Sequence, residues 1–252
     1  MIVVKDLLDP YSRRARLQPA LLAILPLALA LLAWYPSEAK TLGLVWAVVV
    51  SAGGTALLAQ IARERGKRLE KDLFASWGGK PSTVRLRHAG CQNKAILAQR
   101  HNKLRNLFPD LSLPSVDQER AHPARADQIY EACVIGLLER TRDRTEFRLL
   151  FDENCNYGFQ RNLWALKPLG LLLALAAGAL IGWRAFISYQ NTGAVQVLVM
   201  ACLALALGLV LLWIFWVKAE RVKLTAEAFA ERLLASCEVL WPDTKKQSTE
   251  GT

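Results

Sequence analysis

The sequence predicts an all-α membrane protein with four transmembrane helices, arranged as two hairpins around a mostly helical cytosolic insert. Hydrophobic residues make up 53% of the chain, more than a soluble domain usually contains. They form uncharged blocks of 21 residues at 17–37, 22 at 41–62, 16 at 168–183 and 33 at 185–217. A helix needs roughly 20 apolar residues to cross the hydrocarbon core of a membrane, so three of the blocks are long enough to form a span. The remaining span, Pro168–Ser188, suffices if Arg184 extends to the headgroups; the alternative places Arg184 at the outer mouth of a pore.

The ends of the predicted hairpins differ in positive charge. The turn at 35–41 contains Lys40 as its one basic residue and the turn at 189–193 contains none, whereas Lys and Arg flank the opposite ends. The first block is also longer than the apolar part of a cleaved signal peptide. The positive-inside rule therefore places both termini and the insert in the cytoplasm. The five cysteines are widely spaced, which argues against a disulfide framework.

Five segments are expected along the chain. They are a basic cytosolic leader at 1–17, a transmembrane hairpin at 18–62, a cytosolic sensor or binding region at 63–164, a second hairpin at 165–217, and an amphipathic tail helix with a disordered end at 218–252. Charge is uneven in the insert, because residues 63–105 carry 12 basic and 3 acidic side chains, whereas 110–153 carry 6 and 10. The basic half is a candidate surface for a polyanion or for lipid headgroups. The acidic half could face the basic half of a neighbouring subunit.

Local patterns predict the structure of the insert. Apolar spacing indicates helices at 93–108 and 124–142, and Gly78-Gly79 with Lys80-Pro81 indicates a turn. The alternation at 83–87 predicts a short strand, and 109–123 is expected to be a loop.

The turn and the helix after it carry the candidate ligand-binding residues. Trp77 could stack on a base, the adjacent glycines would let backbone N–H groups approach phosphates, and the basic side chains would neutralise them. The predicted set is Trp77, Lys80, Arg85, Arg87, Lys94, Arg100, Lys103 and Arg105. A solvated basic face explains the residues from Lys80 onward equally well, and the juxtamembrane residues 63–71 are expected to contact anionic lipid.

No combination of residues predicts catalysis, so we expect the chain not to be an enzyme. His88, Cys91 and His101 do not match the spacing of a zinc site and lack a fourth ligand. Gly79-Lys80-Pro81-Ser82 lacks the first glycine of a phosphate-binding P-loop. We therefore expect neither a metal nor another cofactor.

Two further groups concern the membrane. Gly178 and Gly182 form a GxxxG pattern, and Gly53 and Gly54 lie in mid-span, so these glycines are expected to pack helices within a hairpin or between subunits. Polar side chains also crowd the entry to the third span. Asn154, Asn156, Arg161 and Asn162 are expected to couple the insert to that span; alternatively, the segment is an interfacial helix.

The stretch from Phe151 to Trp164, FDENCNYGFQRNLW, and the motif WGGKP at 77–81 are the most distinctive parts of the chain. With the overall layout, they resemble a family of bacterial four-span membrane proteins of antiphage defence, the Hailong-type transmembrane effectors, over roughly residues 63–217. The resemblance implies an oligomeric channel of the inner membrane. It also implies gating by an oligonucleotide made by a nucleotidyltransferase encoded nearby.

Taken together, these observations favour a membrane effector of antiphage defence. Several copies, which we expect to form a tetramer, would make an ion channel or pore controlled by a nucleotide or oligonucleotide on the cytosolic basic region. The alternative is a non-conducting anchor in membrane lipid that recruits a protein or nucleic-acid partner. The absence of acidic side chains from the predicted spans disfavours an ion-coupled transporter.

Overall fold

The computed structural model describes residues 9–36 and 43–241, and the side chains of 43–52 lie outside the description. The described chain is helical and contains no strand, which confirms the all-α class. Three expectations concern residues outside this description. They are the start of the basic leader, most of the first turn with Lys40, and the disordered end.

The chain divides into two compact units. Unit 1 comprises residues 1–70 and 155–222, and unit 2 comprises 71–154 and 223–252. The chain passes from one unit to the other within three helices, α4 (Gly43–Ser76), α9 (Arg148–Thr192) and α11 (Ala219–Ala235). The tail helix and the central insert thus contribute to the same folded unit, so residues far apart in sequence can build one site.

Unit 1 contains helices suited to a membrane. Three described helical stretches are long and apolar enough to cross one: Pro10–Trp34, Arg148–Thr192 and Val197–Trp216. The first combines α2 (Pro10–Ser12), the π-helix η1 (Arg13–Leu17) and α3 (Gln18–Trp34), and the last combines α10 (Val197–Leu211) and the π-helix η3 (Leu212–Trp216). The predicted second span lies within α4, where the side chains of 43–52 are not described. It therefore stays a prediction.

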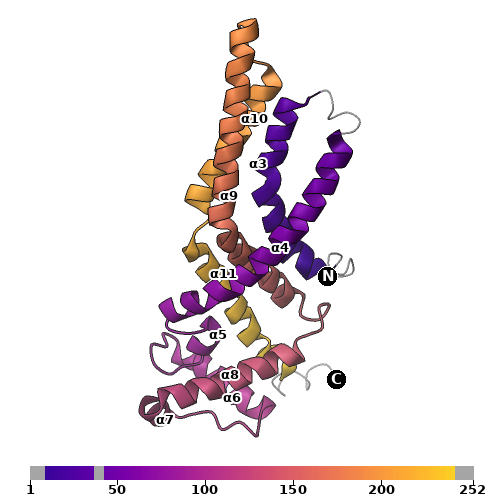
Figure 1. The fold of residues 1–252 in the computed structure, drawn as a ribbon. Coiled ribbons are helices and arrows are strands. Elements are labelled where there is room, and N and C mark those ends of the chain that lie inside the picture. The colour runs from indigo at the N-terminus through magenta and orange to yellow at the C-terminus, as the bar shows by residue number, and fades with distance from the viewer. Residues whose placement is uncertain (1–8, 37–42, 242–252) are drawn as a thin grey trace, which may run out of the picture. The chain divides into compact units, whose positions relative to one another are not determined.

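Small side chains bring the apolar helices of unit 1 together. Helices α3, α9 and α10 lie side by side (Figure 1), and their contact is built from Ala30, Ala33, Ala177, Ile181, Val199, Cys202 and Ala206. A second cluster joins Ala20 and Ala23 of α3 to Leu58, Ala59 and Ala62 of α4 and to the fully buried Trp213. Close approach through small residues is typical of helices in lipid. Lipid tails are as apolar as the side chains, so the helices associate by close packing rather than by the hydrophobic effect.

The predicted packing glycines have different surroundings. A Cβ on Gly54 would lie 2.9 Å from Ile24 Cδ1 of α3, so this glycine lies at a close helix contact. A Cβ on Gly53, Gly178 or Gly182 would meet no other atom of the described chain within 4 Å. The last three glycines therefore do not pack α4 or α9 within one copy, and their role between copies remains a prediction.

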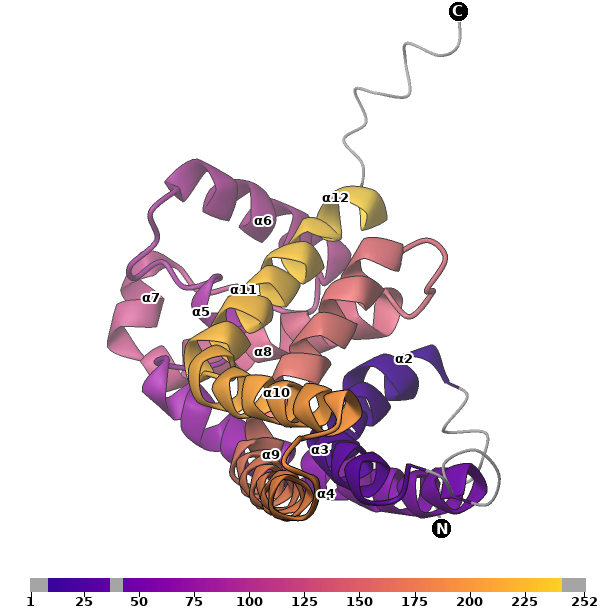
Figure 2. The same ribbon diagram turned by 90° about the horizontal axis from the view of Figure 1, so that it is seen from above.

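Unit 2 is a helical bundle around its own core. It contains α5 (Pro81–Val84), α6 (Lys94–Leu107), α7 (Val116–Ala121), α8 (Pro123–Arg140), most of α11, and α12 (Cys237–Leu240). Figure 2 shows α6 and α11 converging near α12, and the Gln99 side chain on α6 donates to Glu238 of α12 at 3.0 Å. The core comprises Leu86, Leu104, Leu107, Tyr130, Cys133, Leu137, Leu233 and Leu234, with further residues at its edge.

Two local predictions for the insert were wrong. The expected strand at 83–87 is replaced by α5 and the turn after it, because Pro81 starts a helical turn and no described strand is present to pair with. The expected loop at 109–123 contains α7, which starts with a capping box between Ser115 and Gln118. That Ser-x-x-Gln spacing is visible in the sequence. The predicted helices at 93–108 and 124–142 correspond to α6 and α8.

The contact between α9 and Trp213 tests the packing of unit 1. A Cβ on Gly170 would lie 2.3 Å from the rigid ring at Cζ2, so Gly170→Ala forces the helices to shift. We expect this variant to lose about 1–3 kcal/mol of stability, measured by thermal unfolding of the detergent-solubilised protein. Gly178→Ala on the same helix is the matched control, because its Cβ meets nothing. Equal stability of the two variants would contradict this packing.

Candidate anion-binding cleft

A glycine turn forms one edge of the candidate site in unit 2. Gly78 and Gly79 have backbone φ angles of 79° and 137°, which residues other than glycine rarely adopt. The N–H of Gly79 donates to Phe74 O at 2.8 Å, and that of Gly78 donates to Ala75 O at 3.3 Å. These N–H groups therefore cap the end of α4 rather than point toward a ligand, contrary to the role proposed for them from the sequence.

The same turn fixes the position of Arg87. Its guanidinium binds both carboxylate oxygens of Asp127 on α8, from Nε and Nη2, each at 2.7 Å, and Nη1 donates to Gly78 O at 2.8 Å. The side-chain hydrogen bond to Asp127 raises the pKa of Arg87, which outweighs the opposing effect of burial. All three of its polar nitrogens are thus engaged in holding α8 against the turn.

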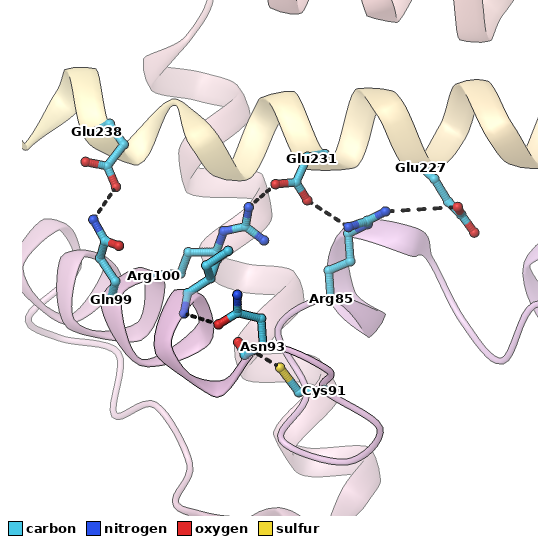
Figure 3. Close-up of polar contacts among 9 residues, drawn as sticks. Arg85, Cys91, Asn93, Gln99, Arg100, Glu227, Glu231 and Glu238 are labelled. Carbon is cyan, nitrogen blue, oxygen red and sulfur yellow. Dashed lines mark hydrogen bonds and ion pairs between the residues drawn. The ribbon is translucent and has the colours of Figure 1, made fainter.

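Arg85 and Arg100 are arranged differently, because they share one carboxylate (Figure 3). Arg85 Nη1 lies 2.7 Å from Glu231 Oε2, and Arg100 Nη2 pairs with Glu231 Oε1. Arg85 Nη2 also lies 4.0 Å from Glu227, which is 3.9 Å from Lys223. Two guanidinium groups from α6 and from the turn after α5 therefore converge on a carboxylate of α11.

These residues surround a cleft of about 720 Å³, which is within the usual size range for small-molecule sites. Its basic side chains are Arg85, Arg87, Arg100 and Lys223, and its acidic ones are Glu227 and Glu231. The other lining residues are Trp77, Gly79, Pro81, Val84, Ala89, Gly90, Cys91, Gln92, Asn93, Ile96 and Leu97. The cleft thus combines basic groups with an aromatic ring and apolar contacts.

Asn93, at the N-terminus of α6, also lines the cleft. Asn93 caps this helix by accepting from the N–H of Ile96 at 3.1 Å, and Cys91 donates to the Asn93 carbonyl at 3.3 Å. The unpaired N–H groups of a helix start carry a partial positive charge. This charge adds to that of the arginines and favours an anion in the cleft.

The structure brings together four of the eight predicted ligand-binding residues. Trp77, Arg85, Arg87 and Arg100 line the cleft. Lys80 instead pairs with Glu131, and Lys103, 3% exposed, pairs with Glu238. Lys94 and Arg105 are exposed on α6 and do not line the cleft.

Sequence reasoning missed the contribution of α11. Lys223, Glu227 and Glu231 lie on successive turns of one helix, and all three line the cleft. A signal was present, because basic and acidic residues four apart on an amphipathic helix mark one charged face. The amphipathic tail helix was predicted from the sequence, but its charged face was not assigned to the ligand site.

Glu119 holds the loop that forms another wall. Its buried carboxylate accepts from the N–H groups of His88 at 2.8 Å and Ala89 at 2.9 Å and from the Tyr130 hydroxyl at 2.7 Å. Burial alone would raise the pKa of Glu119, but these hydrogen bonds outweigh it and lower the pKa. The ionised carboxylate therefore fixes the backbone next to the cleft.

The three residues considered as metal ligands have other partners. The His101 ring contacts Leu86 O at 2.8 Å, and burial lowers the pKa of His101. His88 Nε2 lies 3.2 Å from Pro114 O, and Cys91 donates to a carbonyl. Among residues 9–36 and 43–241, no group of three His, Cys, Asp or Glu side chains is placed to hold a metal ion.

The predicted coupling residues differ in their surroundings. Arg161 Nη1 lies 3.0 Å from Glu70 of α4, and Tyr157 also binds Glu70. Asn162 is 1% exposed and donates to Ala15 O at 2.6 Å. By contrast, Asn156 is exposed, and Asn154 is half-buried in unit 2. Arg161 and Asn162 thus connect α9 to α4 and η1.

Comparisons of the chain with protein families, with curated proteins and with solved structures found no match.

The Glu119 hydrogen bonds lead to a pH-dependent prediction. Because the pKa of Glu119 is lower in the folded state, its carboxylate stabilises the fold at pH values above the ordinary glutamate pKa. This stabilisation is lost as the pH falls through the folded-state pKa. We expect Glu119→Gln to cost about 1–3 kcal/mol at pH 7 and the difference from the unsubstituted protein to shrink as the pH falls below the ordinary glutamate pKa of 4.5. Urea unfolding at several pH values measures this.

Glu139→Gln is the control, because Glu139 pairs with Arg142 on an exposed surface. An effect of Glu119→Gln that is independent of pH would contradict the assignment of an ionised, hydrogen-bonded carboxylate.

Proposed function

We propose that the chain is a subunit of a ligand-gated membrane pore, whose unit 2 binds a nucleotide or short oligonucleotide in the cleft. The supporting observation is that three span-capable helical stretches and a cleft with converging arginines occur in one chain. The WGGKP and FDENCNYGFQRNLW motifs, which resemble antiphage membrane effectors, support a role in defence. The proposal includes a fourth span within α4, two hairpins, and an inner-membrane location with both termini in the cytoplasm.

A nucleotide or oligonucleotide suits the chemistry of the cleft. Phosphates are recognised by guanidinium groups, and bases stack on aromatic rings. Trp77 lies at the edge of the cleft, where its ring packs edge-on against Phe74 at 5.8 Å. The cleft volume of about 720 Å³ accommodates one nucleotide with its phosphates and leaves a longer strand to extend over the surface.

The connection between the last apolar helix and the cleft supports coupling. Helix α11 begins at Ala219, three residues after the end of η3 at Trp216, and Lys223 and Glu227 of α11 line the cleft. The π-helical turn before this junction is a geometry that often occurs at functional sites. Lys167 of α9 donates to Val217 O at 2.7 Å just beyond that turn. A change in α11 would therefore reach the apolar segment through a short stretch of chain.

Conduction would require several copies. The contacts among α3, α9 and α10 in the described part of unit 1 are made by apolar side chains. Among the described residues, these apolar clusters provide no polar path between the helices of one copy, so a pore would form around an axis shared by a homo-oligomer. Exposed apolar residues on α9, such as Leu172, Trp183 and Phe186, would face lipid or a second copy.

The apolar interior of unit 1 equally suits the second function, a non-conducting anchor. In that case the cleft would bind the same class of ligand, or a partner protein, without ion flux. An enzyme has no comparable support, since the cleft contains no paired nucleophile and base among its lining residues.

Ion flux through proteoliposomes containing the purified full-length chain distinguishes the two functions. We expect a 5′-phosphorylated adenine trinucleotide to change the flux and Arg85→Glu to reduce its effect by at least about tenfold, because the charge reversal repels phosphate. Arg105→Glu reverses an exposed charge away from the cleft and should keep the response. Arg87 is unsuitable for this test, because its loss would release Asp127 and the turn.

Flux that is absent with and without a panel of nucleotides would contradict the pore and favour the anchor. A response that survives Arg85→Glu would remove the cleft as the ligand site. Gel filtration of each variant confirms that the protein remains assembled.

A further inference from the structure

We propose that Glu231 occupies, in the unliganded protein, the position of a ligand phosphate, and that a terminal phosphate monoester displaces it. This inference rests on the proposed ligand binding in the cleft and specifies which ligands can enter. It also assigns Glu231 a role as an intramolecular competitor.

The geometry around Glu231 is that of an anion held by two arginines. Each carboxylate oxygen has its own guanidinium partner, Oε2 with Arg85 Nη1 at 2.7 Å and Oε1 with Arg100 Nη2. Figure 3 shows the two arginines approaching the carboxylate from separate segments. A phosphate group presents pairs of oxygens in a similar way, so the two arginines would bind it without rearrangement.

The burial of the three side chains differs in a direction that favours exchange. The Arg100 side chain is 13% exposed and the Arg85 side chain 37%, whereas the Glu231 side chain is 46% exposed. Arg100 is therefore the firmly packed partner, whereas the carboxylate is the most exposed of the three and can rotate into water. The exposed pair with Arg85 contributes little to stability, and the apolar core of unit 2 does not include the Glu231 side chain, so the loss of these contacts is not expected to unfold the unit.

The backbone of α11 does not have to leave the cleft wall. Leu233 and Leu234 of the same helix are buried in the core of unit 2, and Ala226 and Ala230 are buried as well. These apolar contacts hold the helix when the Glu231 side chain swings away. The exchange is therefore a change in side-chain position at a preformed site.

Charge determines which anion can compete. The departing carboxylate carries one negative charge, as does a phosphodiester, and the displaced Glu231 stays near the cleft with Glu227. A terminal phosphate monoester carries about 1.5 to 2 negative charges at pH 7. The monoester therefore gains more from the two arginines and from the N-terminus of α6 than a diester does. The cleft is expected to select 5′- or 3′-phosphorylated ligands over cyclic or internal phosphodiesters.

Binding of two probes to the purified full-length chain in phosphatidylcholine nanodiscs tests this inference. The probes are adenine trinucleotides with and without a 5′ phosphate. We expect the phosphorylated probe to bind more tightly, and Glu231→Gln to raise its affinity by roughly five- to tenfold. Glu238→Gln is the matched control, since Glu238 lies on α12 just after α11, pairs with Lys103 and does not line the cleft.

A purely structural role for Glu231 predicts the opposite pattern. In that case Glu231→Gln would lower the unfolding temperature and leave the affinity unchanged, which would overturn the proposal. Equal affinity for the two probes would also overturn it. Arg100→Gln is expected to remove the preference for the 5′ phosphate, whereas Arg105→Gln on the exposed side of α6 is expected to keep it.

A phosphate monoester could also come from a lipid headgroup. Nanodiscs that contain phosphatidic acid distinguish this source, because the lipid would then compete with the trinucleotide, and Glu231→Gln would strengthen the competition. That result would support the exchange at Glu231 but contradict a nucleotide as the ligand.

The outcomes for the pore and for the exchange are separable. If Glu231→Gln binds the probe more tightly but the probe causes no change in ion flux, the result would support the exchange and contradict the pore. A probe-dependent flux that is identical in Glu231→Gln and the unsubstituted chain would contradict the exchange and leave the pore intact.

Discussion

Pairing of basic side chains with acids from distant parts of the sequence is the interaction that determines which groups of unit 2 line the cleft. The turn at 77–80 and helices α5 and α6 bring many basic groups together, which would repel one another in a compact fold. Asp127 and Glu131 of α8 and Glu227, Glu231 and Glu238 of the C-terminal helices supply the opposing charge. The pairs with Lys80 and Arg87 tie α8 to this basic segment, and the pairs with Arg85 and Arg100 tie α11 to it. The α11 pairs lie in the cleft.

The pairs are not equivalent, and their differences divide the basic residues by role. Arg87 is bound on three nitrogens and Lys103 is almost completely buried, so both are structural elements of the bundle. Arg85 and Arg100 share the partly exposed Glu231 carboxylate, and Arg85 has one further, longer contact of 4.0 Å to Glu227, so their positive charge is only partly compensated. Ligand binding is therefore best supported where the internal pairing is weakest, although sequence reasoning treated all of these residues alike.

Unit 1 follows a different constraint. Its helices have few polar side chains to pair, and they approach through alanine and through the fit of Trp213 against Gly170. The polar contacts occur where α9 meets other segments, through Asn162 to Ala15 O and Arg161 to Glu70. The continuity of α4, α9 and α11 between the units provides a covalent connection through which ligand binding could influence the apolar helices.

The sequence by itself determined the all-α class, the apolar blocks, and the positions of α6 and α8. These features are local, because a helix depends on hydrogen bonds between residues four apart and on a periodic apolar face. The capping box at Ser115 would also have revealed α7, whereas the alternation at 83–87 was misleading because a strand needs a partner. The tertiary structure alone decided which basic residues line the cleft, since Arg85 and Arg100 find Glu231 across 146 and 131 residues of chain. No local pattern encodes such a pair, because it exists only when burial of Leu233 and Leu234 sets α11 beside α6.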